Sequence, residues 1–281
     1  MAREVDRGVG PAAGPGEGRD EGPGAPDGGL PPLLRADLGP DVVAGWTARA
    51  GGVSTGPWAG LDLGQHVGDD PAAVAANRRL LGEVLGAPVV FARQVHGVRS
   101  ALVDPDAVLE PDPYLADLGE RDGGYDALVS ATPGTALGVL VADCVPVLLA
   151  DAGAGVVATA HAGRPGLLAG VLQSVVEAMT AVGARPRRIR AALGPCAGGC
   201  CYEVPQQLQD DACTVLPAAR ARTTWGTPSL DLRAGCAAAL HAAGVDDVQV
   251  VGGCTIEDVS LYSYRRARVT GRFAGAVRML P

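Results

Sequence analysis

The chain has 281 residues, of which 47% are hydrophobic but only 4% aromatic, and its formal net charge is −8. This acidic balance argues against nonspecific binding to nucleic acid, which needs a basic surface. All 23 basic side chains are arginines, which excludes reactions that need a lysine, such as Schiff-base formation. No apolar run is long enough to span a membrane and no hydrophobic leader begins the chain, so we expect a cytoplasmic protein with reduced cysteines.

The first part of the chain has the composition of a disordered segment. Residues 1–32 hold nine glycines and six prolines and almost no large aliphatic side chain. Such a segment cannot bury enough apolar surface to offset its loss of conformational entropy. We therefore assign residues 1–35 to a disordered tail and residues 36–281 to one folded domain.

The domain is predicted to begin with an extended segment from Val42, followed by a helix that starts at Asp70 and Pro71. Aspartate suits the N-cap of a helix, and proline suits its first turn. A short strand at residues 89–92 then leads to His96. The acidic residues 104–124, punctuated by glycine and proline, predict a surface loop.

The most hydrophobic part of the chain follows and predicts short strands at residues 126–130, 136–142, 145–150 and 156–160. Near-continuous apolar runs are typical of strands that are covered on both faces. Further helices are predicted at residues 167–182, 205–215 and 230–243, with strands at 189–193 and 248–251. Strands and helices that alternate without a repeat indicate a single α/β domain with a mixed sheet.

Three residues beside these apolar runs form the strongest candidate site: His96, Cys144 and His161. Two imidazoles and one thiolate are a sufficient ligand set for Zn²⁺, with a fourth position open for water or substrate. Asp143 is a charge inserted into an apolar run, and beside a metal it would orient a histidine or act as a general base. We therefore predict a catalytic metal site, although a single buried cysteine or histidine is more often structural.

Other polar groups are weaker candidates. Cys196, Cys200 and Cys201 lack the paired spacing of a structural zinc site, and adjacent cysteines rarely reach one metal, so a tight loop of small side chains is favoured. Arg49, Arg265 and Arg266 are candidates for binding phosphate or carboxylate, because guanidinium groups bind these anions in bidentate fashion. For each arginine, a surface salt bridge is the more common alternative. His66 precedes the predicted helix and is a weaker ligand candidate than His96 or His161.

Taken together, the motifs resemble the YfiH (DUF152) family of polyphenol oxidase-like proteins, also described as purine nucleoside phosphorylases and as peptidoglycan editing factors. The resemblance covers about residues 42–280 and follows the chain order. The matching segments are Arg49-Ala50-Gly51-Gly52-Val53-Ser54, Leu63-Gly64-Gln65-His66-Val67-Gly68-Asp69, Asn77-Arg78, Arg93-Gln94-Val95-His96-Gly97, Asp126-Ala127-Leu128-Val129, Ala142-Asp143-Cys144-Val145-Pro146, His161-Ala162-Gly163, Gly194-Pro195-Cys196, Cys201-Tyr202-Glu203-Val204, Cys254-Thr255, Tyr264-Arg265-Arg266 and Thr270-Gly271-Arg272.

The resemblance implies a layered α/β/β/α fold and a zinc ion held by His96, Cys144 and His161. It also implies phosphorolysis of adenosine, inosine or methylthioadenosine to the base and ribose 1-phosphate, with adenosine deamination as a companion activity. Cys144, Asp143 and His96 would be the catalytic residues. Nucleoside and phosphate, the expected partners, would be bound by Arg49, Gln94, Arg164, Arg265 and Arg266. We expect a monomer or a weak dimer.

Two departures from the family pattern concern the candidate site. The family commonly reads His-Ala-Gly-Trp-Arg-Gly, whereas this chain reads His161-Ala162-Gly163-Arg164-Pro165-Gly166, so the arginine is displaced by one position. Asp62 stands where the family more usually has asparagine. Neither departure changes the three expected zinc ligands.

Of three other functions considered for such a sequence, two remain open. A multicopper oxidase needs many more imidazoles than the chain's four histidines, so copper oxidation is not expected. Hydrolysis of peptidoglycan precursors would use zinc-bound water, or Cys144 as nucleophile with His161 as base. A non-enzymatic alternative is a partner protein associated with cell division.

Overall fold

The computed structural model describes residues 30–103, 114, 117–119 and 123–281. The expected disorder of residues 1–29, and most of the loop expected at residues 104–124, lie outside the described residues. Residues 30–35 were assigned to the tail, but the structure places Leu34 and Arg35 in a strand. The structured domain therefore begins before residue 36.

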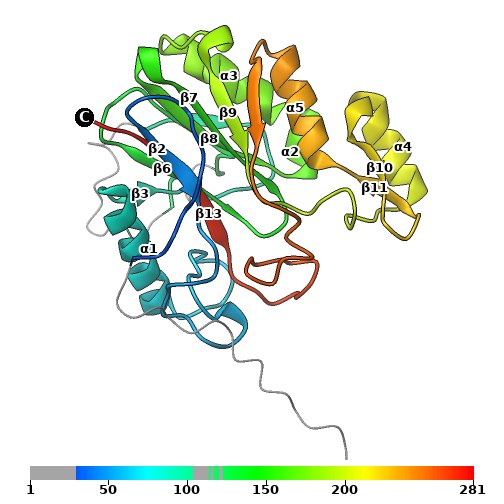
Figure 1. Cartoon of the computed structure of the whole chain (residues 1–281), viewed down its shortest axis with the longest axis horizontal. Coiled ribbons are helices and arrows are strands. Elements are labelled where there is room, and N and C mark those ends of the chain that lie inside the picture. The colour runs from blue at the N-terminus through cyan, green and yellow to red at the C-terminus, as the bar shows by residue number, and fades with distance from the viewer. Residues whose placement is uncertain (1–29, 104–113, 115–116, 120–122) are drawn as a thin grey trace, which may run out of the picture.

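Two large β-sheets form the centre of the molecule (Figure 1). The first has five strands, in the order β1 (Leu34–Arg35), β2 (Val42–Trp46), β13 (Phe273–Met279), β6 (Ala136–Val141) and β3 (Val89–Val90). The second has six, in the order β12 (Asp247–Val250), β9 (Arg190–Leu193), β7 (Val145–Asp151), β8 (Val156–Ala162), β5 (Ala127–Ser130) and β4 (Ser100–Leu102). Both sheets are mixed. In the first, β3 pairs parallel with β6, and in the second, β4 pairs parallel with β5 and β12 pairs parallel with β9, whereas the remaining pairs are antiparallel.

Helices cover the outer faces of the two sheets (Figure 1). Helix α1 (Pro71–Leu85) packs on the five-stranded sheet. Helices α2 (Arg164–Ala169), α3 (Val171–Ala181) and α5 (Leu232–Ala242) pack on the six-stranded sheet. Helix α4 (Gln206–Val215) lies to one side with the hairpin of β10 (Arg220–Arg222) and β11 (Pro228–Leu230). This layer order confirms the α/β/β/α fold.

Strand β7 shows why the central strands read as continuous apolar runs. All seven of its residues are buried. Val147 and Leu149 belong to the core beneath α3 and α5, whereas Leu148 belongs to the core between the two sheets, with Phe273 of β13. Alternate side chains thus enter two different cores, so residues 145–150 are apolar on both faces of the strand.

The predicted start of the first helix is confirmed. The Asp70 carboxylate accepts a hydrogen bond from the backbone N–H of Ala72 at 3.0 Å, and Pro71 is the first helical residue. The helix ends at Gly86, whose φ of 73° is left-handed. No helix in the described part of the chain is both long and apolar enough to cross a membrane.

The structure differs from the sequence prediction at several elements. The helix predicted at residues 167–182 is two helices, because Gly170 between them has a left-handed φ of 103°. Strand β13 was not predicted, since its small residues around Gly275 give a weak apolar pattern. Strand β4 and the β10–β11 hairpin were also missed, because each of their strands has only three residues.

Candidate active site

His96, Cys144 and His161 lie at one end of the six-stranded sheet. Cys144 immediately precedes β7, and His161 is near the end of β8, opposite Pro146 in the antiparallel register. The potential ligand atoms of the three residues all lie within 4.8 Å of one another. The Cys144 Sγ is 3.7 Å from the His96 Nε2, and the two imidazole rings meet edge to face, with centroids 4.6 Å apart. The structure therefore brings the three predicted metal ligands together.

The buried carboxylate of Asp126 positions both histidines. It accepts a hydrogen bond from His161 Nδ1 at 2.8 Å, which leaves Nε2 of that ring available as a ligand. It also accepts the backbone N–H groups of Val95, His96 and Gly97 at 3.2, 2.9 and 2.7 Å. These contacts hold the turn in which His96 has a φ of 60°, an uncommon value for a residue other than glycine.

Asp126 therefore orients a histidine of the cluster, which is a role that the sequence analysis considered for Asp143. The Asp143 carboxylate faces two loops: it accepts hydrogen bonds from Thr255 Oγ1 at 2.6 Å and from the backbone N–H of Arg265 at 2.7 Å. Asp126 begins the motif Asp126-Ala127-Leu128-Val129 but is not among the predicted site residues. A charged residue directly before the apolar strand β5 was the signal that could have identified it, as it did for Asp143.

Cys144 and His161 shift each other's pKa. Burial by itself would raise the pKa of the Cys144 thiol, but the positive charge of His161 and hydrogen bonds from both histidines outweigh it and lower the pKa to about 6. Burial would lower the pKa of His161, but the Cys144 thiolate and the hydrogen bond to Asp126 raise it to about 9. The site thus favours a thiolate beside a positive charge, which a divalent cation would also provide.

Two glycines allow the close packing around the ligands. A Cβ atom at Gly163 would lie 2.6 Å from the His96 ring and 3.2 Å from the Cys144 Sγ. A Cβ atom at Gly166 would lie 2.6 Å from the backbone oxygen of Gly97. Helix α2 can therefore begin directly against the ligand cluster only because both positions are glycine.

Arg164 follows Gly163 and is the first residue of α2. Its side chain is half-buried and makes no hydrogen bond or ion pair with any residue that the structure describes. The displaced arginine of the family motif thus has no hydrogen bond or ion pair with a described residue, and it directly follows Gly163 in the chain.

The other predicted anion-binding residues are more engaged. The Arg49 guanidinium lies over the Tyr262 ring and donates to the backbone oxygen of Ala59 at 3.4 Å. Arg265 lies over the Tyr202 ring and donates to the backbone oxygen of Glu203 at 2.7 Å. Each therefore has one side fixed by an aromatic ring.

Arg266 and Gln94 bind backbone groups. The Arg266 guanidinium donates to four carbonyl oxygens in one loop, those of Thr255, Ile256, Asp258 and Leu261. The Gln94 side chain donates to the Leu140 oxygen and accepts from the Leu140 N–H, both at 2.8 Å, like a residue of a neighbouring strand. The hydrogen-bonding groups of both side chains are therefore engaged with backbone atoms.

A cleft of about 530 Å³ includes Arg93 and Gln94, which precede His96 in the chain. It is lined by Gln65, His66, Arg93, Gln94 and Asp117. Burial and then the positive charge of Arg272 lower the pKa of His66. Burial also lowers the pKa of the Arg272 guanidinium, against the opposing effect of the negative charges of Asp62 and Cys144. Arg272, which was not among the predicted site residues, therefore adds positive charge between this cleft and Cys144.

Comparisons with known proteins agree on one family. A family model described as multi-copper polyphenol oxidoreductase laccase matches residues 43–280. A protein of Streptomyces coelicolor named purine nucleoside phosphorylase is 50% identical over 83% of this chain and 93% of the relative. A Mycobacterium tuberculosis protein of the same name is 49% identical over 83% of this chain and 90% of the relative.

Solved structures show the same fold. A Neisseria meningitidis protein described by the family model DUF152 has a TM-score of 0.77 and 35% identity, covering 89% of this chain and 99% of that protein. YlmD from Geobacillus stearothermophilus has a TM-score of 0.75 and 32% identity, covering 89% of this chain and 100% of that protein.

Proposed function

Because this chain belongs to the laccase-like YfiH/DUF152 family, we propose that it is a zinc-dependent purine nucleoside phosphorylase. The substrates would be phosphate and adenosine, inosine or methylthioadenosine, and the products the free base and ribose 1-phosphate. Adenosine deamination would be a companion activity. The observation that carries the proposal is the convergence of His96, Cys144 and His161, and the names of the relatives support the phosphorolytic reaction.

The donor atoms suit zinc. One sulfur and two imidazole nitrogens are typical zinc ligands, and the hydrogen bond from His161 to Asp126 is the usual second contact of a metal-binding histidine. His96 is exposed, which leaves one side of the cluster open to substrate. When bound, zinc would supply a Lewis acid and lower the pKa of a coordinated water. A multicopper oxidase would need more imidazoles than the four histidines of the chain provide.

Arg164 is our candidate for the main phosphate ligand. Its guanidinium has no hydrogen-bonding or ionic partner among the described residues. Arg164 also directly follows Gly163, which packs against His96 and Cys144. Arg49 and Arg265 would contact the nucleoside or phosphate with the faces that their aromatic partners leave free. We assign Gln94, Arg266 and Asp143 to positioning, because their polar atoms already bind β6 or the two loops beside Cys144.

The test combines zinc content with phosphate-dependent release of base from adenosine and inosine. We expect His96→Ala and Cys144→Ala each to lower both zinc affinity and turnover by about 100-fold or more, because each removes a ligand. His241→Ala is the matched control, since this exposed histidine of α5 does not belong to the His96, Cys144 and His161 cluster. Bound zinc without nucleoside turnover would contradict the phosphorylase, and a zinc-free wild type would contradict the metal site.

One observation favours a second candidate function. The Cys144 thiolate beside protonated His161 is also the arrangement of a cysteine nucleophile, which would suit hydrolysis of an amide in a peptidoglycan precursor. This alternative predicts activity that survives metal chelation and is lost on alkylation of Cys144. The phosphorylase predicts loss of activity on chelation and recovery when zinc is restored.

A further inference from the structure

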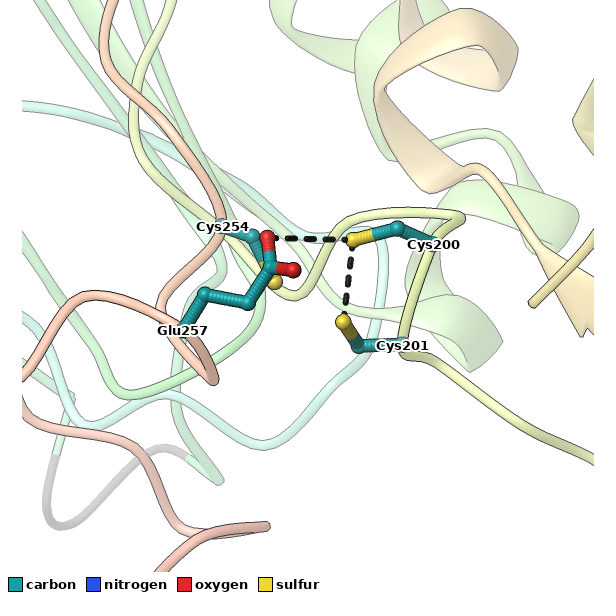
Figure 2. A group of neighbouring side chains, drawn as sticks. All are labelled: Cys200, Cys201, Cys254 and Glu257. Atoms are coloured by element: carbon teal, nitrogen blue, oxygen red, sulfur yellow. Dashed lines mark hydrogen bonds between the residues drawn. The ribbon is translucent and has the colours of Figure 1, made fainter. Parts of the chain in front are cut away.

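Cys200, Cys201, Cys254 and Glu257 form a second group of potential metal ligands, which shares no residue with the first (Figure 2). One ligand atom from each residue lies within 4.8 Å of all the others. The Cys200 Sγ is 3.0 Å from the Cys201 Sγ and 3.4 Å from the Glu257 Oε2. Cys196, which the sequence analysis grouped with Cys200 and Cys201, is buried and is not part of this cluster.

The local backbone explains how two adjacent cysteines face the same point. The N–H groups of Cys201 and Tyr202 both donate to the Gly198 oxygen at 2.9 Å, which closes a tight turn. A Cβ atom at Gly198 would lie 3.1 Å from the Cys200 Sγ and 3.5 Å from the Cys254 Sγ, so glycine lets both sulfurs approach the turn. Adjacent cysteines were not expected to reach one metal, but this turn brings the sulfurs of Cys200 and Cys201 to the same side.

The second loop brings the other two ligands. The Glu257 N–H donates to the Cys254 oxygen at 3.2 Å, so these two residues are one turn apart and on the same side. The backbone N–H of Gly198 donates to the Cys254 Sγ at 3.3 Å. This hydrogen bond fixes the Cys254 sulfur beside the turn that carries Cys200 and Cys201.

We propose that these four residues bind one zinc ion in a structural site. Three thiolates and one carboxylate match the preference of zinc for sulfur with one harder donor. Four protein ligands complete a tetrahedral set and leave no open position for a substrate, unlike the His96, Cys144 and His161 cluster. Binding would release the protons of the three thiols.

The ion would cross-link two loops that flank Cys144. In the first loop the Ala197 N–H donates to the backbone oxygen of Asp143 at 2.9 Å. In the second, Thr255 and Arg265 donate to the Asp143 carboxylate. A zinc ion between Cys200, Cys201, Cys254 and Glu257 would therefore fix the position of the residue that precedes a ligand of the first site.

The first measurement is the zinc content of the full chain, reconstituted under reducing conditions. We expect two zinc ions per chain in the wild type and one in His96→Ala, which keeps only the second site. Adding Cys254→Ser to His96→Ala should remove this remaining ion, whereas adding Cys213→Ala should not, because Cys213 lies outside both clusters. Cobalt in place of zinc should give a sulfur-to-metal charge-transfer band in His96→Ala that Cys254→Ser abolishes.

A second variant separates ligand loss from misfolding. Glu257 is exposed, so Glu257→Gln should keep the fold but weaken zinc binding in the His96→Ala chain by about tenfold or more. Glu177→Gln, also at an exposed glutamate, is the control and should change nothing. The proposal is overturned if His96→Ala binds no zinc, if the double variant His96→Ala/Cys254→Ser retains the ion, or if thiol titration shows a disulfide in the cluster. None of these results decides the proposed function, which the turnover of His96→Ala and Cys144→Ala tests separately.

Discussion

The carboxylate of Asp126 accepts four N–H groups, and this number decides what a single substitution would do there. Asparagine has one oxygen acceptor, so Asp126→Asn cannot satisfy the three backbone N–H groups of residues 95–97 together with the His161 ring. We expect the zinc affinity of the first site to fall by about 10- to 100-fold. Competition with a chelator measures the zinc affinity of the variant and of the wild type. Asp70→Asn is the control, because asparagine caps a helix as well as aspartate does.

Asp62 gives a pH-dependent prediction. One carboxylate oxygen accepts the N–H groups of Gly64 and Arg272 at 3.0 and 2.8 Å, but the other is buried and has no hydrogen-bond partner among the residues that the structure describes. Burial, with a smaller effect of the Asp69 charge, raises the pKa of Asp62 from 3.8 to about 7. When the pKa of an aspartate is higher in the folded than in the unfolded state, the protein's free energy of unfolding falls as the pH rises between the two pKa values. For Asp62 this range is from 3.8 to about 7.

Asp62→Asn removes this loss, since the amide does not ionise. The gain in unfolding free energy should therefore be larger at pH 8 than at pH 5, by about 2 to 3 kcal/mol. Urea denaturation at the two pH values tests the difference. An equal gain at both would show that Asp62 ionises normally in the folded protein.

Trp46 shows at the scale of elements how the two sheets are joined. The fully buried indole of β2 lies against Gly275 of β13 and against Gly194, just after β9 of the other sheet. A Cβ atom at Gly275 would lie 2.8 Å from the indole nitrogen. Both glycines make room for the large ring in the core between the sheets.

We expect Gly275→Ala to destabilise the protein by about 1 to 3 kcal/mol, because the ring and the strand have to move apart. Gly253→Ala is the control, since a Cβ atom there meets nothing within 4 Å. Denaturant unfolding compares the two. Equal stability of both variants would mean that the sheets adapt at no cost.

The sequence predicted best the elements whose signals are local. The start of α1 follows from Asp70 and Pro71, and β7 and β8 follow from uninterrupted apolar runs. Strand β13 could not be found in this way. Its position between β2 and β6 depends on pairing with residues more than 130 positions earlier in the chain, and its own residues carry a weak pattern.

The same distinction holds for the candidate site. His96, Cys144 and His161 were identified by residue type and motif, and the structure brings them together. A charge before an apolar strand could have marked Asp126 as a candidate, but its contact with His161 depends on the register in which β5 pairs with β8, and the sequence near Asp126 does not give that register. The second cluster was missed for a similar reason, since Cys254 and Glu257 lie more than 50 residues after Cys200.

At the scale of the whole molecule, the two ends of the described chain share one sheet. Strands β1 and β2 come from its beginning, and β13 from its end. Deleting residues 273–281 would separate β2 from β6 and open the core that contains Trp46 and Phe273. We expect that variant to lose the cooperative unfolding transition seen by circular dichroism. Deleting residues 1–29, whose composition predicts disorder, should leave the transition unchanged.

The ligands of the first site come from three segments that meet only when β5, β7 and β8 are paired. An unfolded chain therefore offers zinc no preformed site, and on the proposed function the metal binds the native state alone. Each tenfold rise in free zinc above the dissociation constant would then add about 1.4 kcal/mol to the apparent stability. Zinc supply would thereby set not only how much enzyme is active but how long each molecule escapes proteolysis.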